Sequence, residues 1–86
     1  MENKVLIKLI VPALDKDFDI FIPVNEVVWK IKKMLIKSVM DITDTNLNVN
    51  SYYILINKEN GNIYNDNQII IDTDIRNISE LMLIEE

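Results

Sequence analysis

Residues 4–22, KVLIKLIVPALDKDFDIFI, contain two segments in which apolar and polar side chains alternate. In the first segment the lysines share one side of the alternation, which is typical of a strand that buries its other side. In the second segment aspartates alternate with apolar side chains, and PALDK between the segments supplies a turn. The pattern predicts an antiparallel hairpin, with Lys8 close to Asp17 or Asp19 on its exposed side.

The stretch DKDFDIFIPVNE, residues 15–26, also has the acidic spacing of an EF-hand calcium loop. Such a loop needs glycine at its sixth position for a sharp bend, and Ile20 stands there. A strand extended by ~3.3 Å per residue cannot wrap its own side chains around one ion. The alternation therefore favours a strand over a metal site.

A helix is predicted from about Asn25 to Met40, with Asn25 as a plausible N-cap after the strand-ending Pro23. At 100° per residue its apolar side chains gather on one broad face, and Lys30, Lys33 and Lys37 fall opposite. The residues of the apolar face are Val24, Val27, Val28, Ile31, Met34, Leu35, Ser38 and Val39. We expect this helix to lie across the sheet.

The rest of the chain predicts a second hairpin and a last strand. Residues 51–57, SYYILIN, read as a strand, and Asn60-Gly61 is a dipeptide that favours a tight turn before a short strand around Ile63 and Tyr64. In the irregular segment that follows, we expect Ile70, Ile75 and Ile78 to close the end of the core. The final strand, SELMLIEE, points Leu81 and Leu83 one way and Met82 and Ile84 the other.

This order of elements predicts one domain, residues 1–86, of the α+β class. Hairpin, helix, hairpin and last strand fit a ubiquitin-like β-grasp, with a mixed five-stranded sheet and one helix packed across one face. The last strand would lie parallel to the first, which the long connection through the helix permits.

The chain as a whole resembles the YukD/EsaB ubiquitin-like proteins of Gram-positive bacteria. The resemblance rests on FDIFIP before the helix, on YILINKENGNIY, and above all on the tail IIDTDIRNISELMLI. In that tail the family pattern falls on Ile70, Asp72, Ile75, Asn77, Leu81 and Leu83. The family commonly has glycine after the Asn, whereas this chain has Ile78. A β-branched residue resists positive φ, so the turn into the last strand is expected to differ if it needs that conformation.

The resemblance implies a small cytoplasmic accessory component of a type VII (ESX-like) secretion system. Its partner would be a secretion-system membrane ATPase or another component of that system. The resemblance also implies that the protein is not conjugated to others, and the ending LMLIEE has no Gly-Gly tail. A general adaptor with the same fold but no link to secretion remains the alternative.

Composition excludes several other functions. The chain has neither His nor Cys, which removes thiol chemistry and most zinc sites, and no Gly-rich phosphate loop is present. The net charge of −5 argues against nucleic acid as a partner. No apolar run approaches the ~20 residues that span a bilayer, so no direct membrane insertion is expected. We therefore expect a non-enzymatic, cytoplasmic protein without cofactor or metal.

Binding is the better class of function, and the sheet face opposite the helix is the first candidate surface. If Tyr52, Ile54 and Ile56 point into the core, their neighbours in the strand point out. The predicted surface is then Leu6, Lys8, Ile10, Phe21, Tyr53, Leu55, Met82 and Ile84. Exposed apolar patches of this extent usually mark an interaction site. Two alternatives are that single exposed Leu and Ile residues are ordinary on a small domain, and that a homodimer buries the same face.

The second candidate surface lies on the helix. Trp29, Ile36 and Met40 fall well away from the core direction, and Trp is favoured at binding hot spots. The alternative is that the loop 41–51 folds back over this stripe, because so small a domain rarely leaves a Trp uncovered.

Overall fold

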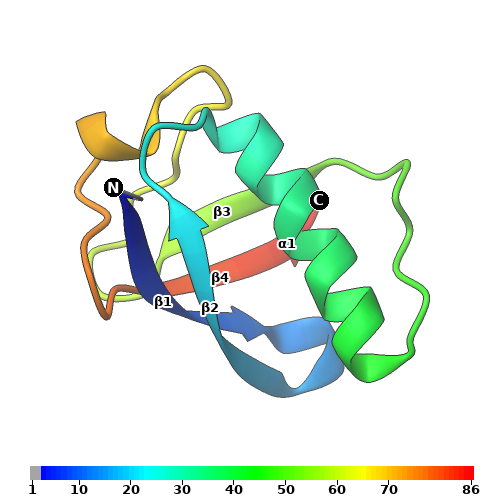
Figure 1. Cartoon of the computed structure of the whole chain (residues 1–86). Coiled ribbons are helices and arrows are strands. Elements are labelled where there is room, and N and C mark those ends of the chain that lie inside the picture. Colours follow the sequence, from blue (N-terminus) through cyan, green and yellow to red (C-terminus); the bar gives the residue numbers. More distant parts are fainter. Residues whose placement is uncertain (1–2) are drawn as a thin grey trace.

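The computed structural model describes residues 3–86, and in this range the sheet has four strands. β1 (Lys4–Val11) and β2 (Lys16–Pro23) form the predicted antiparallel hairpin, in which Lys8 pairs with Asp19. β4 (Glu80–Glu85) lies parallel beside β1, and β3 (Tyr53–Asn57) pairs antiparallel with β4. The order across the sheet is β2-β1-β4-β3 (Figure 1).

The turn of the first hairpin is a short 3₁₀ helix, η1 (Pro12–Leu14). Asp15 closes it in the left-handed conformation, at φ 53°, and donates its backbone N–H to the Pro12 carbonyl at 3.0 Å. Pro12 suits the start of such a turn because its φ is fixed and it lacks an N–H. Strand β2 begins directly afterwards, so most of the stretch with calcium-loop spacing is extended, as the alternation predicts.

The single helix, α1 (Val28–Thr43), begins later than predicted, and Asn25 is not its N-cap. Val27 holds the cap position without a side-chain bond. The free amides of the first turn are satisfied instead by backbone carbonyls, with the Val28 N–H donating to Gln68 O at 2.8 Å and the Trp29 N–H to Asp66 O at 3.2 Å. A distant segment therefore does the work that the sequence assigns to a local cap.

The predicted fifth strand is wrong. Ile63 forms only an isolated bridge with Ile56. The two backbone hydrogen bonds of this bridge run from the Asn57 N–H to Asn62 O and from the Tyr64 N–H to Leu55 O. Gly61 makes the predicted turn at φ 76°. After Tyr64 the chain turns away from the sheet: the Gln68 N–H donates to Asn65 O at 3.1 Å, and the Asp66 and Gln68 carbonyls accept from the first turn of α1. Tyr64 itself is buried, and its hydroxyl is hydrogen-bonded by side chains.

The core lies between α1 and one face of the sheet. Its fully buried side chains include Ile7, Leu9, Ile31, Leu35 and Leu55. The second 3₁₀ helix, η2 (Ile70–Asp72), and the segment after it close one end with Ile70 and Ile75, as predicted.

Ile78 does not join the core, contrary to expectation, since 71% of it is exposed. It also adopts a φ of 72°, the positive value that its β-branched side chain was expected to prevent. One backbone hydrogen bond from Ile78 and one hydrogen bond to the side chain of its neighbour Asn77 hold this turn against Leu6. The Ile78 N–H donates to Leu6 O at 2.6 Å, and the Asn77 side chain accepts the Leu6 N–H at 2.9 Å.

One helix laid across one face of a mixed sheet, with the last strand parallel to the first, is the ubiquitin-like β-grasp arrangement (Figure 1). The connection from α1 to β3 swings out beside the helix, and no helix or strand within residues 3–86 lies over the other face of the sheet. No helix within residues 3–86 is long and apolar enough to cross a membrane.

Candidate functional site: the open face of the sheet

The face of the sheet away from α1, called the open face below, carries every second residue of each strand. Paired positions in the register share a face, so the strands assign its members without ambiguity. They are Lys4, Leu6, Lys8 and Ile10 from β1, Asp17, Asp19, Phe21 and Pro23 from β2, Ile54 and Ile56 from β3, and Glu80, Met82 and Ile84 from β4. None of these side chains is buried.

The apolar members of the open face are gathered, and most lie in a main patch of Ile10, Ile54, Ile56, Met82 and Ile84. The register joins Ile56 to Met82 and Met82 to Ile10, while Ile54 stands opposite Ile84. Each of these side chains keeps part of its surface in contact with solvent. A contiguous exposed apolar group of this kind is typical of an interaction site.

A minor patch lies nearer the other end of the strands and consists of Leu6, Phe21 and Ile78. Leu6 pairs with Phe21, which is 62% exposed, and its backbone is bonded to that of Ile78. Ile78 lowers the stability of the fold in two ways, because its positive φ strains the backbone and its apolar side chain is exposed to solvent.

A row of alternating charge, called the charge belt, separates the two patches and consists of Asp19, Lys8, Glu80 and Lys58. Lys8 is paired with Asp19 on one side and with Glu80 on the other. Lys58 follows β3 directly, and its Nζ lies 3.4 Å from Glu80 Oε1. The belt therefore crosses all four strands in the order minus, plus, minus, plus.

Two of the predicted surface residues are placed wrongly. Tyr53 is 6% exposed and Leu55 is fully buried, so both belong to the core, and Ile54 and Ile56 replace them on the open face. The sequence of β3 is apolar on both sides of its alternation and could not decide between them. Its one polar residue, Asn57, is buried, which is the reverse of what its polarity indicates.

Burial of Asn57 is possible because its amide is hydrogen-bonded on both sides. Its Nδ2 donates to the Tyr64 hydroxyl at 3.1 Å, and its Oδ1 accepts the Glu59 N–H at 2.8 Å. Burying a polar group lowers stability little when the group is hydrogen-bonded. The parity of β3, meaning which alternate residues of the strand face the core, is therefore set by this network rather than by hydropathy. The other predicted members, Leu6, Lys8, Ile10, Phe21, Met82 and Ile84, lie on the open face.

The same polar network continues to Asp74. The Tyr64 hydroxyl donates to Asp74 Oδ1, and the Asn60 and Asn62 amides each donate to Asp74 Oδ2 at 2.9 Å. The hydrogen bond from Tyr64 lowers the pKa of Asp74, and burial together with that bond raises the pKa of Tyr64 to about 12. The network fastens the Asn60-Gly61 turn to the segment before β4.

The helix candidates divide. Ile36 is 7% exposed and therefore belongs to the core, and Met40 is half-buried against it. Trp29 keeps 41% of its surface, with the ammonium groups of Lys30 and Lys33 at 5.6 and 5.4 Å from its ring centroid. The predicted stripe is therefore not a continuous surface.

The loop after α1 covers this stripe only in part. Leu47 of this loop packs against the core, but Val49 remains 62% exposed. Ile42, which was predicted to belong to the loop, lies in the last turn of α1 and is 61% exposed. An open groove of about 570 Å³ remains between helix and loop, lined by Lys33, Ile36, Lys37, Met40, Asp41 and Val49.

Lys32 is the one helix lysine that faces inward, which the sequence did not indicate. Its Nζ donates to Tyr53 O at 2.6 Å, lies 2.6 Å from Asp66 Oδ1 and sits 4.2 Å from the Tyr52 ring centroid. These contacts tie α1 to β3 and to the segment that caps the helix. The role of Lys32 is structural.

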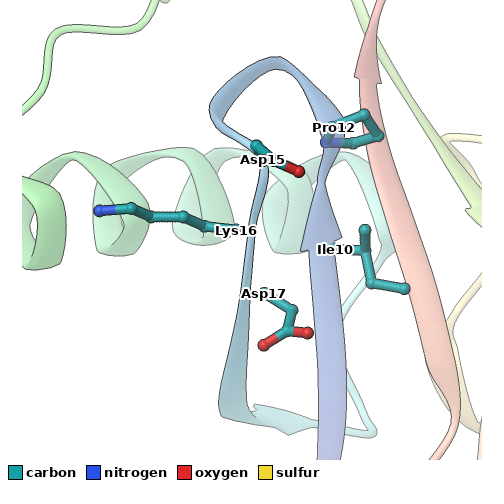
Figure 2. A pocket seen from close by; sticks show the side chains of 5 residues that line it. All are labelled: Ile10, Pro12, Asp15, Lys16 and Asp17. Atoms are coloured by element: carbon teal, nitrogen blue, oxygen red, sulfur yellow. The ribbon is translucent and has the colours of Figure 1, made fainter.

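A further depression, of about 550 Å³, lies at the closed end of the first hairpin. Figure 2 shows Ile10, Pro12, Asp15 and Asp17 around it, with Lys16 extending in the opposite direction to Ile10. Among residues 3–86, no cluster of three or more acidic side chains could hold a metal ion. The depression continues the open face toward the hairpin turn.

Comparison with known proteins supports the fold and leaves the family undetermined. No family model matches the chain, and no curated protein matches it either. Among solved structures, a chain of the ESX-5 inner membrane complex is similar over 98% of this chain, with a TM-score of 0.77 and 11% identity. The present chain spans only 21% of that protein.

Other structural neighbours are of diverse kinds. The ubiquitin-like domain of Plasmodium falciparum Dsk2 has a TM-score of 0.71 at 17% identity, with 96% of this chain and 99% of that chain covered. A chain of the toluene 4-monooxygenase HD complex has a TM-score of 0.79 at 4% identity, with 98% and 100% covered. At such identities the likeness shows the ubiquitin-like fold alone, because this fold carries many unrelated functions.

Proposed function

We propose that this chain is a non-catalytic protein-interaction module that binds its partner through the open face. The observation that carries the proposal is the main patch, in which five large apolar side chains lie together on one face of the sheet, each only partly buried. The charge belt beside it would fix the register of the partner, because misplaced charges at an interface are costly.

The proposed setting is a type VII secretion system, in which the chain would act as a cytoplasmic accessory component. The resemblance of the tail to YukD/EsaB proteins supports this setting, and so does the structural likeness to a chain of the ESX-5 inner membrane complex. The proposed partner is the membrane ATPase of that system or another of its components.

The test compares two variants that carry the same Ile→Glu substitution on different surfaces of the protein. Ile84→Glu places a charge in the main patch, and Ile42→Glu places one at the end of α1, where the side chain is 61% exposed. Binding to the purified cytoplasmic region of the secretion ATPase from the same organism is measured by calorimetry. We expect a loss of tenfold or more for Ile84→Glu, since charging an interface centre costs a few kcal/mol, and little change for Ile42→Glu.

Thermal unfolding of both variants serves as the control for folding. Equal binding by the two folded variants would contradict the use of the open face. Tyr53→Glu cannot serve in this test, although Tyr53 was predicted to be exposed, because a charge at its buried site would unfold the protein.

A second candidate function is structural, with the open face buried against another copy of the chain. The alternating signs of the charge belt favour it.

A further inference from the structure

The charge belt has a property that its individual ion pairs do not have. Read from β2 to β3 its signs are minus, plus, minus, plus, for Asp19, Lys8, Glu80 and Lys58. Read from β3 to β2 the signs are reversed at every position. A belt of this kind is complementary to its own reversed copy.

We propose that the open face binds a second copy of this chain around a two-fold axis that runs parallel to the strands, between β1 and β4. This operation lays the belt on its reversed copy. Asp19 of each copy then faces Lys58 of the other, and Lys8 faces Glu80. The inference rests on the proposed function, since it names one occupant of the same binding face.

The same axis also matches the apolar parts of the face. Ile10 of one copy stands over Met82 of the other, and the remaining isoleucines of the main patch lie around this contact. In the minor patch, Leu6 comes opposite Ile78, whose backbone lies beside Leu6 in its own copy, and this gives the strained and exposed Ile78 a place to be buried. An isologous interface requires such self-complementarity.

The alternative axis fails on charge. A two-fold axis perpendicular to the strands, along the belt, would set each charged residue against its own copy. Asp19 would face Asp19 and Lys8 would face Lys8, and like charges directly opposed are destabilising. Strands stacked nearly parallel also agree with aligned sheet packing, in which mean strand directions differ by about 30°.

The size of the face indicates a weak dimer. Four strands spaced ~4.8 Å apart and about six residues long cover roughly 400 Å² in projection. A stable interface buries about 800 Å² of accessible surface on each partner, so this face lies at the low end. We expect self-association to appear at micromolar to millimolar concentration and to yield to a tighter partner.

The test exploits the distance between the two ends of the belt. Asp19 and Lys58 lie three strand spacings apart, about 14 Å, and cannot form a pair within one copy. Asp19→Lys alone sets two pairs of positive charges against each other in the dimer, and Lys58→Glu alone sets two negative pairs. An equimolar mixture of the two variants restores both attractive contacts.

Sedimentation equilibrium of wild type, each variant and the mixture measures the effect. We expect each single variant to dimerise about tenfold more weakly than wild type, and the mixture to recover most of that loss as a heterodimer. Lys37→Glu, on the exposed side of α1, makes the same charge change off the face and should leave dimerisation unchanged.

The results separate this inference from the proposed function. A wild-type protein that stays monomeric throughout, or a mixture that dimerises no better than its components, would overturn the dimer. If the dimer is overturned but Ile84→Glu still abolishes binding to the secretion ATPase, the proposal that the open face binds a partner stands. If the dimer responds to the charge variants as expected but Ile84→Glu does not weaken binding to the secretion ATPase, then a second copy of the chain is the one supported occupant of the open face.

Discussion

The two faces of the sheet are built from alternate residues of the same strands, yet they differ in burial and in charge. On the covered face Ile7, Leu9 and Leu81 have no exposed surface, and shape decides which side chains fit. On the open face similar side chains are only partly covered, and a belt of charges runs among them. Hydropathy alone does not separate the two faces, because both are rich in isoleucine and leucine. What separates them is the helix on one side and the ordered charges on the other.

The largest difference is expected from neighbouring residues of β3. Leu55→Ala empties a fully buried site and should lower the free energy of unfolding by about 2–5 kcal/mol, whereas Ile54→Ala, on the open face, should cost about 1 kcal/mol or less. Urea unfolding of the two variants measures both values. Equal losses would mean that the parity of β3 is not as described.

A smaller effect of opposite sign is expected at Ile78. Replacing it with glycine removes the strain of a β-branched residue at φ 72° and should raise the free energy of unfolding by about 1 kcal/mol, while weakening self-association. Ile71→Gly is the matched control, since Ile71 is also exposed but has no positive φ, and it should destabilise slightly. A destabilised Ile78→Gly would show that this turn is not strained.

The smallest effect concerns pH and the network that sets the parity of β3. The pKa of Asp74 lies below its ordinary value of 3.8, so its contribution to stability is present above that pH and is lost as pH falls through the folded pKa. The pKa of Tyr64 is raised from 10.0 to about 12, so its contribution is present below pH 10 and is lost between about 10 and 12.

Thermal unfolding against pH measures both limits. We expect Asp74→Asn to flatten the acid limb and Tyr64→Phe to flatten the alkaline limb, relative to wild type. Variants whose melting temperatures follow the wild-type curve at both ends would show that the network does not contribute.

Local patterns predicted those elements whose residues decide their own structure. The first hairpin, the Gly61 turn, the alternation of β4 and the parallel pairing of β1 with β4 follow from alternation, turn chemistry and chain order. The exceptions have distant causes. The start of α1 is set by the carbonyls of Asp66 and Gln68, and the turn over residues 65–68 that places them leads the chain away from the sheet after Tyr64.

The candidate site was predictable to the same extent. The open-face members from β1 and β2 follow from the lysines and aspartates that mark the solvent side of these strands, and those from β4 follow from its alternation with Leu81 and Leu83. β3 has no lysine or aspartate to mark its solvent side. Its polar residue Asn57 predicts the opposite orientation to the observed one, because hydrogen bonds with Tyr64 and Glu59 allow it to be buried. The charge belt required the register, since its residues come from four separate segments of the chain.

The position of β4 has a consequence for synthesis. This strand is last in the chain but lies between β1 and β3, so neither neighbour can complete its pairing until residues 80–85 have been made. At ~5–20 residues per second, the stretch from residue 57 to residue 85 takes a few seconds to translate. During that interval the edges of β1 and β3 that will pair with β4 remain unpaired. An unpaired strand edge can pair with the wrong strand, so the strands on either side of β4 are open to mispairing until β4 has been made.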